Sequence, residues 1–281
     1  MTEDDYGRFA KLTFDDFRRM AQDDSLSRYE KIGFPDSYRE GKEELIFRRM
    51  AQDDSLSRNE KIGFPDSYRE GKEELIFQSI AATLPLLNAA RKVVLDIGPG
   101  CSELPRMLIG LCRERGHKLL LVDSEEMLSH LPNDGFVQKY AAYYPQCESL
   151  FEVYRSKVDV IVAYSVLHHV FAEGNVWDFL DRSLELLAEG GEMLIGDVPN
   201  ISKRRRFFSS AAGIRFHQQF TNSQSLPEVN FNRIERQQID DCVVLAMLSR
   251  ARNQGFDAYV LPQSSGLPMA NRREDLLIRR P

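Results

Sequence analysis

Residues 93–100 read Val-Val-Leu-Asp-Ile-Gly-Pro-Gly, a β-branched apolar run that ends in Asp-x-Gly-x-Gly. This order predicts a buried strand that stops at a turn where the backbone approaches another group closely. Residues 104–111 can then restart the chain as a helix. A strand, a glycine-rich turn and a helix in succession form a nucleotide-binding edge in α/β proteins, so we expect such an edge here.

Composition and charge narrow the class of protein. The chain has 281 residues, of which 42% are apolar and 28% are charged, as in ordinary soluble domains. A net charge of −6 argues against broad attraction to nucleic acid, and no apolar run has the length of a membrane span. The N-terminus is acidic and lacks the order of a signal peptide. The four cysteines show no CxxC or zinc spacing, so we expect reduced thiols, a cytoplasmic location and no metal.

The N-terminal quarter contains a tandem repeat. Residues 18–47 and 48–77 are the same thirty-residue sequence apart from Tyr29 and Asn59. Units of a solenoid diverge more than this, so the pattern indicates a recent or deliberate duplication. Each unit holds a Gly-Phe-Pro-Asp turn, a capping box (37–40 and 67–70) and then a helix, with Leu45, Ile46 and Met50 as its apolar side where the two copies meet. No breaker separates residues 43 and 51, so the first helix should continue into the second copy.

The repeat predicts a helical N-terminal region at residues 1–90, ahead of a second domain at 91–281. Two copies cannot occupy one docking site. One copy therefore docks on the domain, and the other projects or docks on a neighbouring molecule, which would allow a homodimer through the N-terminal helices. The alternative is that the duplication has no function.

From residue 91 onward, strand patterns alternate with helix patterns, which predicts a doubly wound α/β domain. Residues 199–236 are polar, basic and aromatic without clear periodicity, and we interpret them as a substrate-side insertion or lid. Helices are predicted at 104–115, at 124–128 with Ser124 as N-cap, at 177–187 and at 239–253. Strands are predicted at 93–97, 118–123, 135–140, 158–164, 192–198, 257–263 and 274–280, with a helix stop at 188–191.

The motifs around these strands resemble one family. The third glycine of a dinucleotide-binding G-x-G-x-x-G is missing. Instead an acid ends the second strand, Tyr-Ser-Val-Leu-His-His stands at 164–169 and Leu-Ala-Glu-Gly-Gly at 187–191. Together with Asp-x-Gly-x-Gly these resemble the class I S-adenosylmethionine-dependent methyltransferases over about residues 91–281. Ser102 stands where the full family motif has its last glycine. The resemblance implies a seven-stranded sheet whose last strand is antiparallel.

The resemblance also implies a cofactor site. Gly98 and Gly100 would let the backbone pass close to the methionine and ribose of S-adenosylmethionine. Asp96 suits the amino group, and Asp123 suits the ribose hydroxyls. Many relatives carry an acid after the third strand, where this chain has Tyr140 to Tyr143. The implied cofactor residues are Asp96, Gly98, Pro99, Gly100, Asp123, Ser124, Met127, Tyr164 and Ser165.

Candidate catalytic groups follow the fourth and fifth strands. His168 or His169 could take a proton from the methyl acceptor, because an imidazole titrates near neutral pH, and Asp197 faces the same rim. The alternatives are that 167–170 is a structural turn, or that methyl transfer to a nucleophilic atom needs only alignment.

Residues 203–206 are four consecutive cations beside aromatic residues, which could hold a phosphate or a nucleotide-linked substrate or could be a solvated face of the lid. Arg204, Arg205 and His217 are the candidate substrate residues.

The predicted function is methyl transfer from S-adenosylmethionine to oxygen or nitrogen of a small molecule, such as an anionic sugar or nucleotide-linked metabolite, with S-adenosylhomocysteine as product. The N-terminal helices would cover the cofactor or the substrate. Two alternatives stay open: an RNA or protein methyltransferase, which the acidic total disfavours, and a non-catalytic scaffold of the same fold.

Overall fold

The computed structural model describes residues 50, 52–53, 55–62, 71–231 and 237–281. The chain divides into two compact units, residues 1–71 with 205–233 and residues 72–204 with 234–281. The predictions for the first repeat copy and for the capping box at 67–70 lie outside the described residues. Among those described, no helix is long and apolar enough to cross a membrane.

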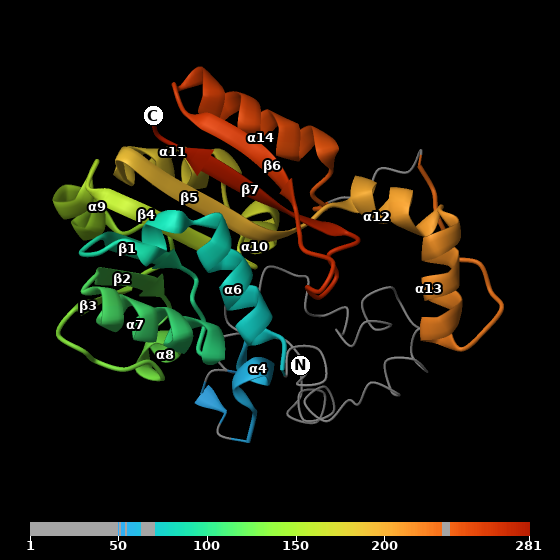
Figure 1. The fold of residues 1–281 in the computed structure, drawn as a ribbon, viewed down its shortest axis with the longest axis horizontal. Coiled ribbons are helices and arrows are strands. Elements are labelled where there is room, and N and C mark those ends of the chain that lie inside the picture. Colours follow the sequence, from blue (N-terminus) through green and yellow to red (C-terminus); the bar gives the residue numbers. More distant parts are fainter. Residues whose placement is uncertain (1–49, 51, 54, 63–70, 232–236) are drawn as a thin grey trace. The chain divides into compact units, whose positions relative to one another are not determined.

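The larger unit is built on a seven-stranded sheet of order β3-β2-β1-β4-β5-β7-β6 (Figure 1). Strands β1 to β5 are parallel, and β7 runs antiparallel to both of its neighbours. This confirms the predicted sheet and its antiparallel last strand. The strands are β1 (Val93–Ile97), β2 (Lys118–Asp123), β3 (Val137–Ala141), β4 (Val158–Tyr164), β5 (Leu187–Pro199), β6 (Asp257–Pro262) and β7 (Arg273–Arg279).

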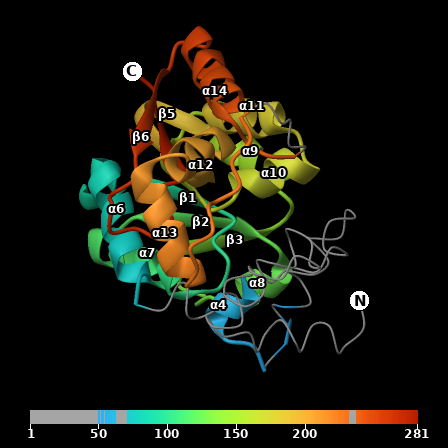
Figure 2. The same ribbon diagram turned by 90° about the vertical axis from the view of Figure 1, so that its right-hand side faces the viewer.

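Helices cover both faces of the sheet, with the strands between them (Figure 2). The central strands are therefore buried on both sides: Leu95 packs into one apolar cluster and its neighbour Val94 into the other. One face carries α6 (Glu73–Thr83), the short 3₁₀ helix η3 (Pro85–Asn88), α7 (Glu103–Arg115) and α8 (Glu125–Ser129). The other carries α9 (Glu148–Tyr154), α10 (Leu167–Glu173), α11 (Val176–Leu186) and α14 (Asp241–Asn253).

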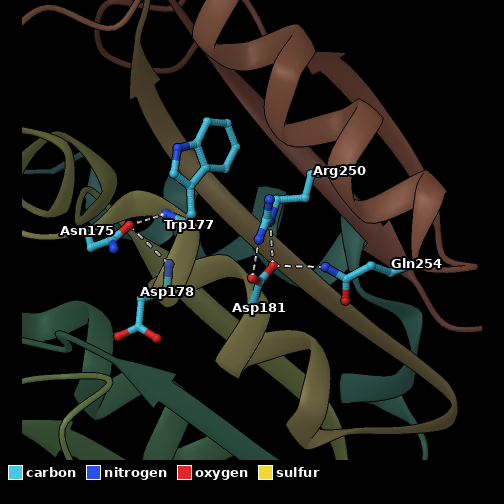
Figure 3. Close-up of polar contacts among 6 residues, drawn as sticks. All are labelled: Asn175, Trp177, Asp178, Asp181, Arg250 and Gln254. Carbon is cyan, nitrogen blue, oxygen red and sulfur yellow. Dashed lines mark hydrogen bonds and ion pairs between the residues drawn. The ribbon is translucent and has the colours of Figure 1, made fainter.

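Several helix ends form as the sequence predicts. Gly116 ends α7 in the left-handed conformation, with φ of 67°. Ser124 caps α8, because its Oγ accepts the Met127 N–H at 3.3 Å. Asn175 caps α11 by accepting the N–H groups of Trp177 and Asp178, so that helix begins one residue before its predicted start (Figure 3).

Two sequence predictions are wrong in detail. Strand β5 begins at Leu187 instead of residue 192, because Leu187 pairs with Val158 ahead of a bulge. The predicted lid at 199–236 is not aperiodic, since it contains α12 (Ile201–Phe208) and α13 (Ala211–Thr221). Asn200 starts α12, as its Oδ1 accepts the N–H groups of Ser202 and Lys203. Side-chain caps start such short helices without an apolar period in the sequence.

The smaller unit contains α13 and the four-residue helix α4 (Arg58–Lys61). Helix α4 opens with a capping box: Ser57 Oγ accepts the Glu60 N–H at 3.2 Å, and Glu60 Oε2 accepts the Ser57 N–H at 2.8 Å. Ser210 Oγ caps α13 by accepting the Gly213 N–H at 3.1 Å.

Candidate functional site

A pocket lies at the carboxyl edge of the sheet between β1 and β4, where the strand order reverses. Such a switch point is where open α/β sheets bind ligands. Helices α6 and α7 contribute most of its apolar wall. The lining residues are Phe77, Ile80, Asp96, Gly98, Pro99, Leu104, Leu108, Val162 and Tyr164.

The turn after β1 depends on its two glycines. Gly98 and Gly100 both have φ of 65°, in the region that only glycine adopts at low cost. A Cβ atom at Gly98 would lie 2.7 Å from Cγ2 of Val166, too close for any side chain. The Gly98 N–H donates to the Val122 carbonyl at 2.9 Å, which joins the turn to β2.

Asp123 joins the same turn from the end of β2. Its two carboxylate oxygens accept the N–H of Gly100 at 2.8 Å and that of Ser124 at 2.7 Å. Burial raises the pKa of Asp123 to about 6, while these two hydrogen bonds and the nearby His169 act in the opposite direction. Each oxygen keeps a further lone pair for a hydroxyl donor.

Asp96 is a second carboxyl group at this edge, and it is buried, with an exposed fraction of 6%. Burial raises its pKa to about 8, and the charge of Asp123 adds to the shift. A bound cation would stabilise the ionised form of Asp96, so the site electrostatically favours a ligand with a positive group.

Tyr164, Ser165 and Asp197 come together where β4 and β5 end. The Tyr164 ring lies against Gly196, where any Cβ would overlap it. Ser165 Oγ donates to Asp197 Oδ2 at 2.5 Å, and the Arg273 guanidinium forms an ion pair with the same carboxylate. The Asp197 carboxylate is already engaged by a hydroxyl group and a guanidinium group, so this geometry fits an anchor better than a general base.

His168 and His169 lie in the first turn of α10, with ring centroids 3.9 Å apart and both side chains partly exposed. His169 is near enough to Asp123 to lower its pKa. Of the other predicted cofactor residues, Met127 is buried on α8. Tyr140 is the penultimate residue of β3 and accepts a hydrogen bond from Gln138 Nε2 at 2.6 Å.

The three candidate substrate residues are not brought into one described site. Arg204 belongs to the larger unit, whereas Arg205 and His217 belong to the smaller one. His217 Nε2 lies 3.3 Å from Ser225 Oγ, beside the ring of Phe208. Their substrate role stays a prediction.

Sequence reasoning missed the apolar half of the pocket. Phe77 and Ile80 on α6 are three residues apart, and Leu104 and Leu108 on α7 are four apart, so helical spacing could have indicated two shared faces. It also missed Glu73, whose buried carboxylate accepts the Glu103 N–H at 2.8 Å and so fixes α6 at the start of α7.

Comparison with known proteins agrees with this geometry. A family model described as a methyltransferase domain matches residues 68–233, more than half of the chain. Comparison with curated protein sequences gives no match.

Solved structures share the fold at low sequence identity. The N-methyltransferase NodS from Bradyrhizobium japonicum WM9, solved with S-adenosyl-L-homocysteine, is 14% identical, with a TM-score of 0.50 over 85% of this chain and 98% of that one. The plantazolicin methyltransferase BamL is 16% identical, with a TM-score of 0.51 over 85% and 97%. The CurJ carbon methyltransferase is 14% identical, with a TM-score of 0.51 over 87% and 68%.

The sheet order, the glycine turn and the acids that end β1 and β2 define a Rossmann-like methyltransferase. The chain belongs to the methyltransferase-domain family. It is an S-adenosylmethionine-dependent enzyme, as its family resemblance implied.

The residues present fit this cofactor. Gly98 and Gly100 hold the turn in a conformation that glycine adopts at low cost, and neither carries a side chain that would keep a ligand away from the backbone. Asp96 offers a buried carboxyl group to the cofactor's ammonium, and Asp123 offers acceptor lone pairs to its ribose hydroxyls.

Proposed function

We propose that the enzyme methylates an oxygen or nitrogen atom of a small molecule. When bound, S-adenosylmethionine supplies an electrophilic methyl group and leaves as S-adenosylhomocysteine. The acceptor atom forms the new bond to carbon and loses a proton, which passes to solvent or to the imidazole of His168 or His169. The observation that carries the proposal is the pair of carboxyl groups on either side of the glycine turn, Asp96, which is buried, and Asp123, which is half-buried and bonded to the turn.

Each side chain has a role in this proposal. Asp96 binds the ammonium group, Asp123 the ribose hydroxyls, and Ser124 with Met127 flanks the adenine. Tyr164 and the apolar wall formed by α6 and α7 exclude water from the transfer point, which strengthens every polar contact there.

A small-molecule acceptor is supported by two observations. The net charge is −6, which disfavours the RNA alternative, and the similar solved structures include a methyltransferase crystallised with a desmethyl plantazolicin analogue. Arg204, Arg205 and His217 would bind an anionic sugar or nucleotide-linked acceptor. We also infer a cytoplasmic enzyme from its four free cysteines, three of them buried, and a homodimer through the N-terminal helices.

The first test is calorimetric titration with S-adenosylhomocysteine. Wild-type protein should bind it, and Asp123→Ala should weaken binding by about a hundredfold, because a charged hydrogen-bond acceptor for two hydroxyls is lost. Asp257→Ala, an exposed aspartate at the start of β6, is the matched control and should bind normally. A wild-type protein that does not bind would favour the non-catalytic scaffold. A screen of metabolites for S-adenosylhomocysteine release would then identify the acceptor.

A further inference from the structure

The carboxyl ends of β4 and β5 are held in a strained conformation by an ionic network from β7. Ser165 and Asp197 have φ of 61° and 59°, so two non-glycine residues occupy the left-handed region side by side. Such residues cost on the order of 1–3 kcal/mol each and persist only where the surroundings over-determine them.

A bulge in β5 produces this arrangement. Ile195 pairs with Leu276 and Val198 with Glu274, so Gly196 and Asp197 together face the single residue Asp275. A bulge of this kind re-aims a side chain at the edge of a sheet. Here the Asp197 N–H donates to Asp275 Oδ1 at 2.8 Å, and Gln263 Nε2 holds the same oxygen at 2.9 Å.

The re-aimed Asp197 carboxylate is buried between a cation and a hydroxyl group. Arg273 pairs with it, and both side chains are nearly buried, with exposed fractions of 12% and 8%. Ser165 is fixed twice, since its N–H donates to the Gly196 carbonyl at 3.0 Å and its Oγ donates to Asp197 at 2.5 Å. Because its own hydrogen is directed at Asp197, the Ser165 oxygen can offer only lone pairs to another group.

We propose that Arg273 is a positioning residue. The Arg273–Asp197 pair orients Ser165 so that its Oγ accepts a hydrogen bond from the N–H or O–H of the atom that is methylated. This inference rests on the proposed function and sharpens its substrate class. The contact selects a methyl-accepting substrate whose reacting atom carries a hydrogen, as in an amine or a hydroxyl group, over one whose reacting atom has only lone pairs. Ser165 is not itself a pocket-lining residue, but it directly follows Tyr164, the last residue of β4, which is one.

The probe for this contact is sinefungin, a cofactor analogue in which a carbon bearing an ammonium group replaces the methylated sulfur. Its N–H donors stand where the methyl group would be. We expect wild-type protein to bind sinefungin about tenfold or more tighter than S-adenosylhomocysteine, as for a hydrogen bond to a charged group. Ser165→Ala and Arg273→Met should each reduce this ratio toward one, and Arg273→Met should leave the affinity for S-adenosylhomocysteine within about twofold.

Two further variants separate positioning from stability. Arg279→Met removes the other arginine of β7 that has an ion-pair partner, Glu192, and should lower the melting temperature without changing the ratio. Arg273→Lys keeps the positive charge and should retain part of the preference for sinefungin over S-adenosylhomocysteine. This variant tests the role of the charge if Arg273→Met does not fold.

Two outcomes would overturn the inference: no preference for sinefungin in the wild type, or an unchanged ratio in Ser165→Ala. Failure of wild-type protein to bind S-adenosylhomocysteine would instead contradict the proposed function itself.

Discussion

Asp96 shows how one residue can oppose folding and still be required for binding. Its pKa is about 8 in the folded protein and 3.8 in the unfolded chain, so the folded state holds more protons between these values. The free energy of unfolding therefore falls as the pH rises from about 4 to 8, and the cofactor's ammonium would offset this loss on binding.

We expect Asp96→Asn to raise the stability of the ligand-free protein at pH 7 by a few kcal/mol, on the order that linkage gives. The same variant should lose S-adenosylhomocysteine binding, because the buried negative charge is gone. Thermal unfolding from pH 4 to 8, with calorimetry at pH 7, checks both effects. A variant that is less stable than the wild type at every pH would contradict this assignment of charge.

Gly196 supports Tyr164 by having no side chain. A Cβ at this position would overlap the Tyr164 ring, so Gly196→Ala must push the ring toward the pocket. We expect a loss of about 1–3 kcal/mol in unfolding free energy, as for overpacking, and about tenfold weaker S-adenosylhomocysteine binding.

Gly110→Ala is the control for this substitution. Gly110 lies inside α7 with open space around it, so alanine there should stabilise the helix by up to about 1 kcal/mol and leave binding unchanged. Equal binding by both variants would show that the Tyr164 ring has no part in the cofactor pocket.

At the scale of elements, an ionic clamp joins α11 to α14 (Figure 3). Arg250 donates to both carboxylate oxygens of Asp181, at 2.7 and 2.5 Å, and Gln254 donates to one of them at 2.8 Å. The hydrogen bond from Arg250 holds the pKa of Asp181 below its ordinary value. The clamp therefore stabilises the fold above the ordinary pKa of an aspartate, and this contribution is lost as the pH falls through the folded-state pKa.

Asp181→Asn should lower the melting temperature at pH 7 by about 1–3 °C, a small effect because both side chains are partly exposed to solvent. The difference from the wild type should shrink as the pH is lowered toward acid. Asp178→Asn removes the same charge one turn earlier, where the side chain lies apart from Arg250, and should change the melting temperature less (Figure 3). A difference that grows in acid would show that the clamp does not act through the Asp181 charge.

The elements also show what a sequence can and cannot predict. Strands buried on both faces, such as 93–97 and 158–164, were predicted with their observed bounds, because apolar runs and glycine breaks are local signals. Helix α12 was missed because Asn200, Asp241 and Glu274 meet only in the fold, where the two acids accept the Asn200 amide and so fix the cap of α12. Likewise Asp96 and Asp123 could be predicted, because each stands near the end of a strand. The ion pair between Arg273 and Asp197 could not, because these residues are 76 positions apart in the sequence and meet only through the pairing of β5 with β7.

At the scale of the whole molecule, the repeat allows an unusually well-controlled deletion. Deleting residues 18–47 or residues 48–77 leaves the same chain except for one residue, Asn59 or Tyr29. Either product keeps the sequence of helix α6, including the glutamate that caps α7 and the isoleucine equivalent to Ile76, which is 2% exposed. The residues that line the pocket are therefore the same in either product.

We expect both deletion proteins to be expressed in soluble form and to bind S-adenosylhomocysteine within about threefold of the full chain. A threefold change corresponds to a difference in binding free energy of less than about 1.4 kcal/mol. Deleting residues 18–77 is the control. It removes Glu73 and Ile76, so the N-terminus of α7 loses its carboxylate and the buried side of α6 loses an isoleucine, although Phe17 then stands before Gln78 in the place of Phe77. Binding should fall sharply. Light scattering on the same three proteins tests the dimer, because only the full chain carries a second copy to dock on a neighbour. Loss of soluble expression in both single-copy proteins would show that the two copies are structural together, and a dimer that persists in them would show that the duplication is not its interface.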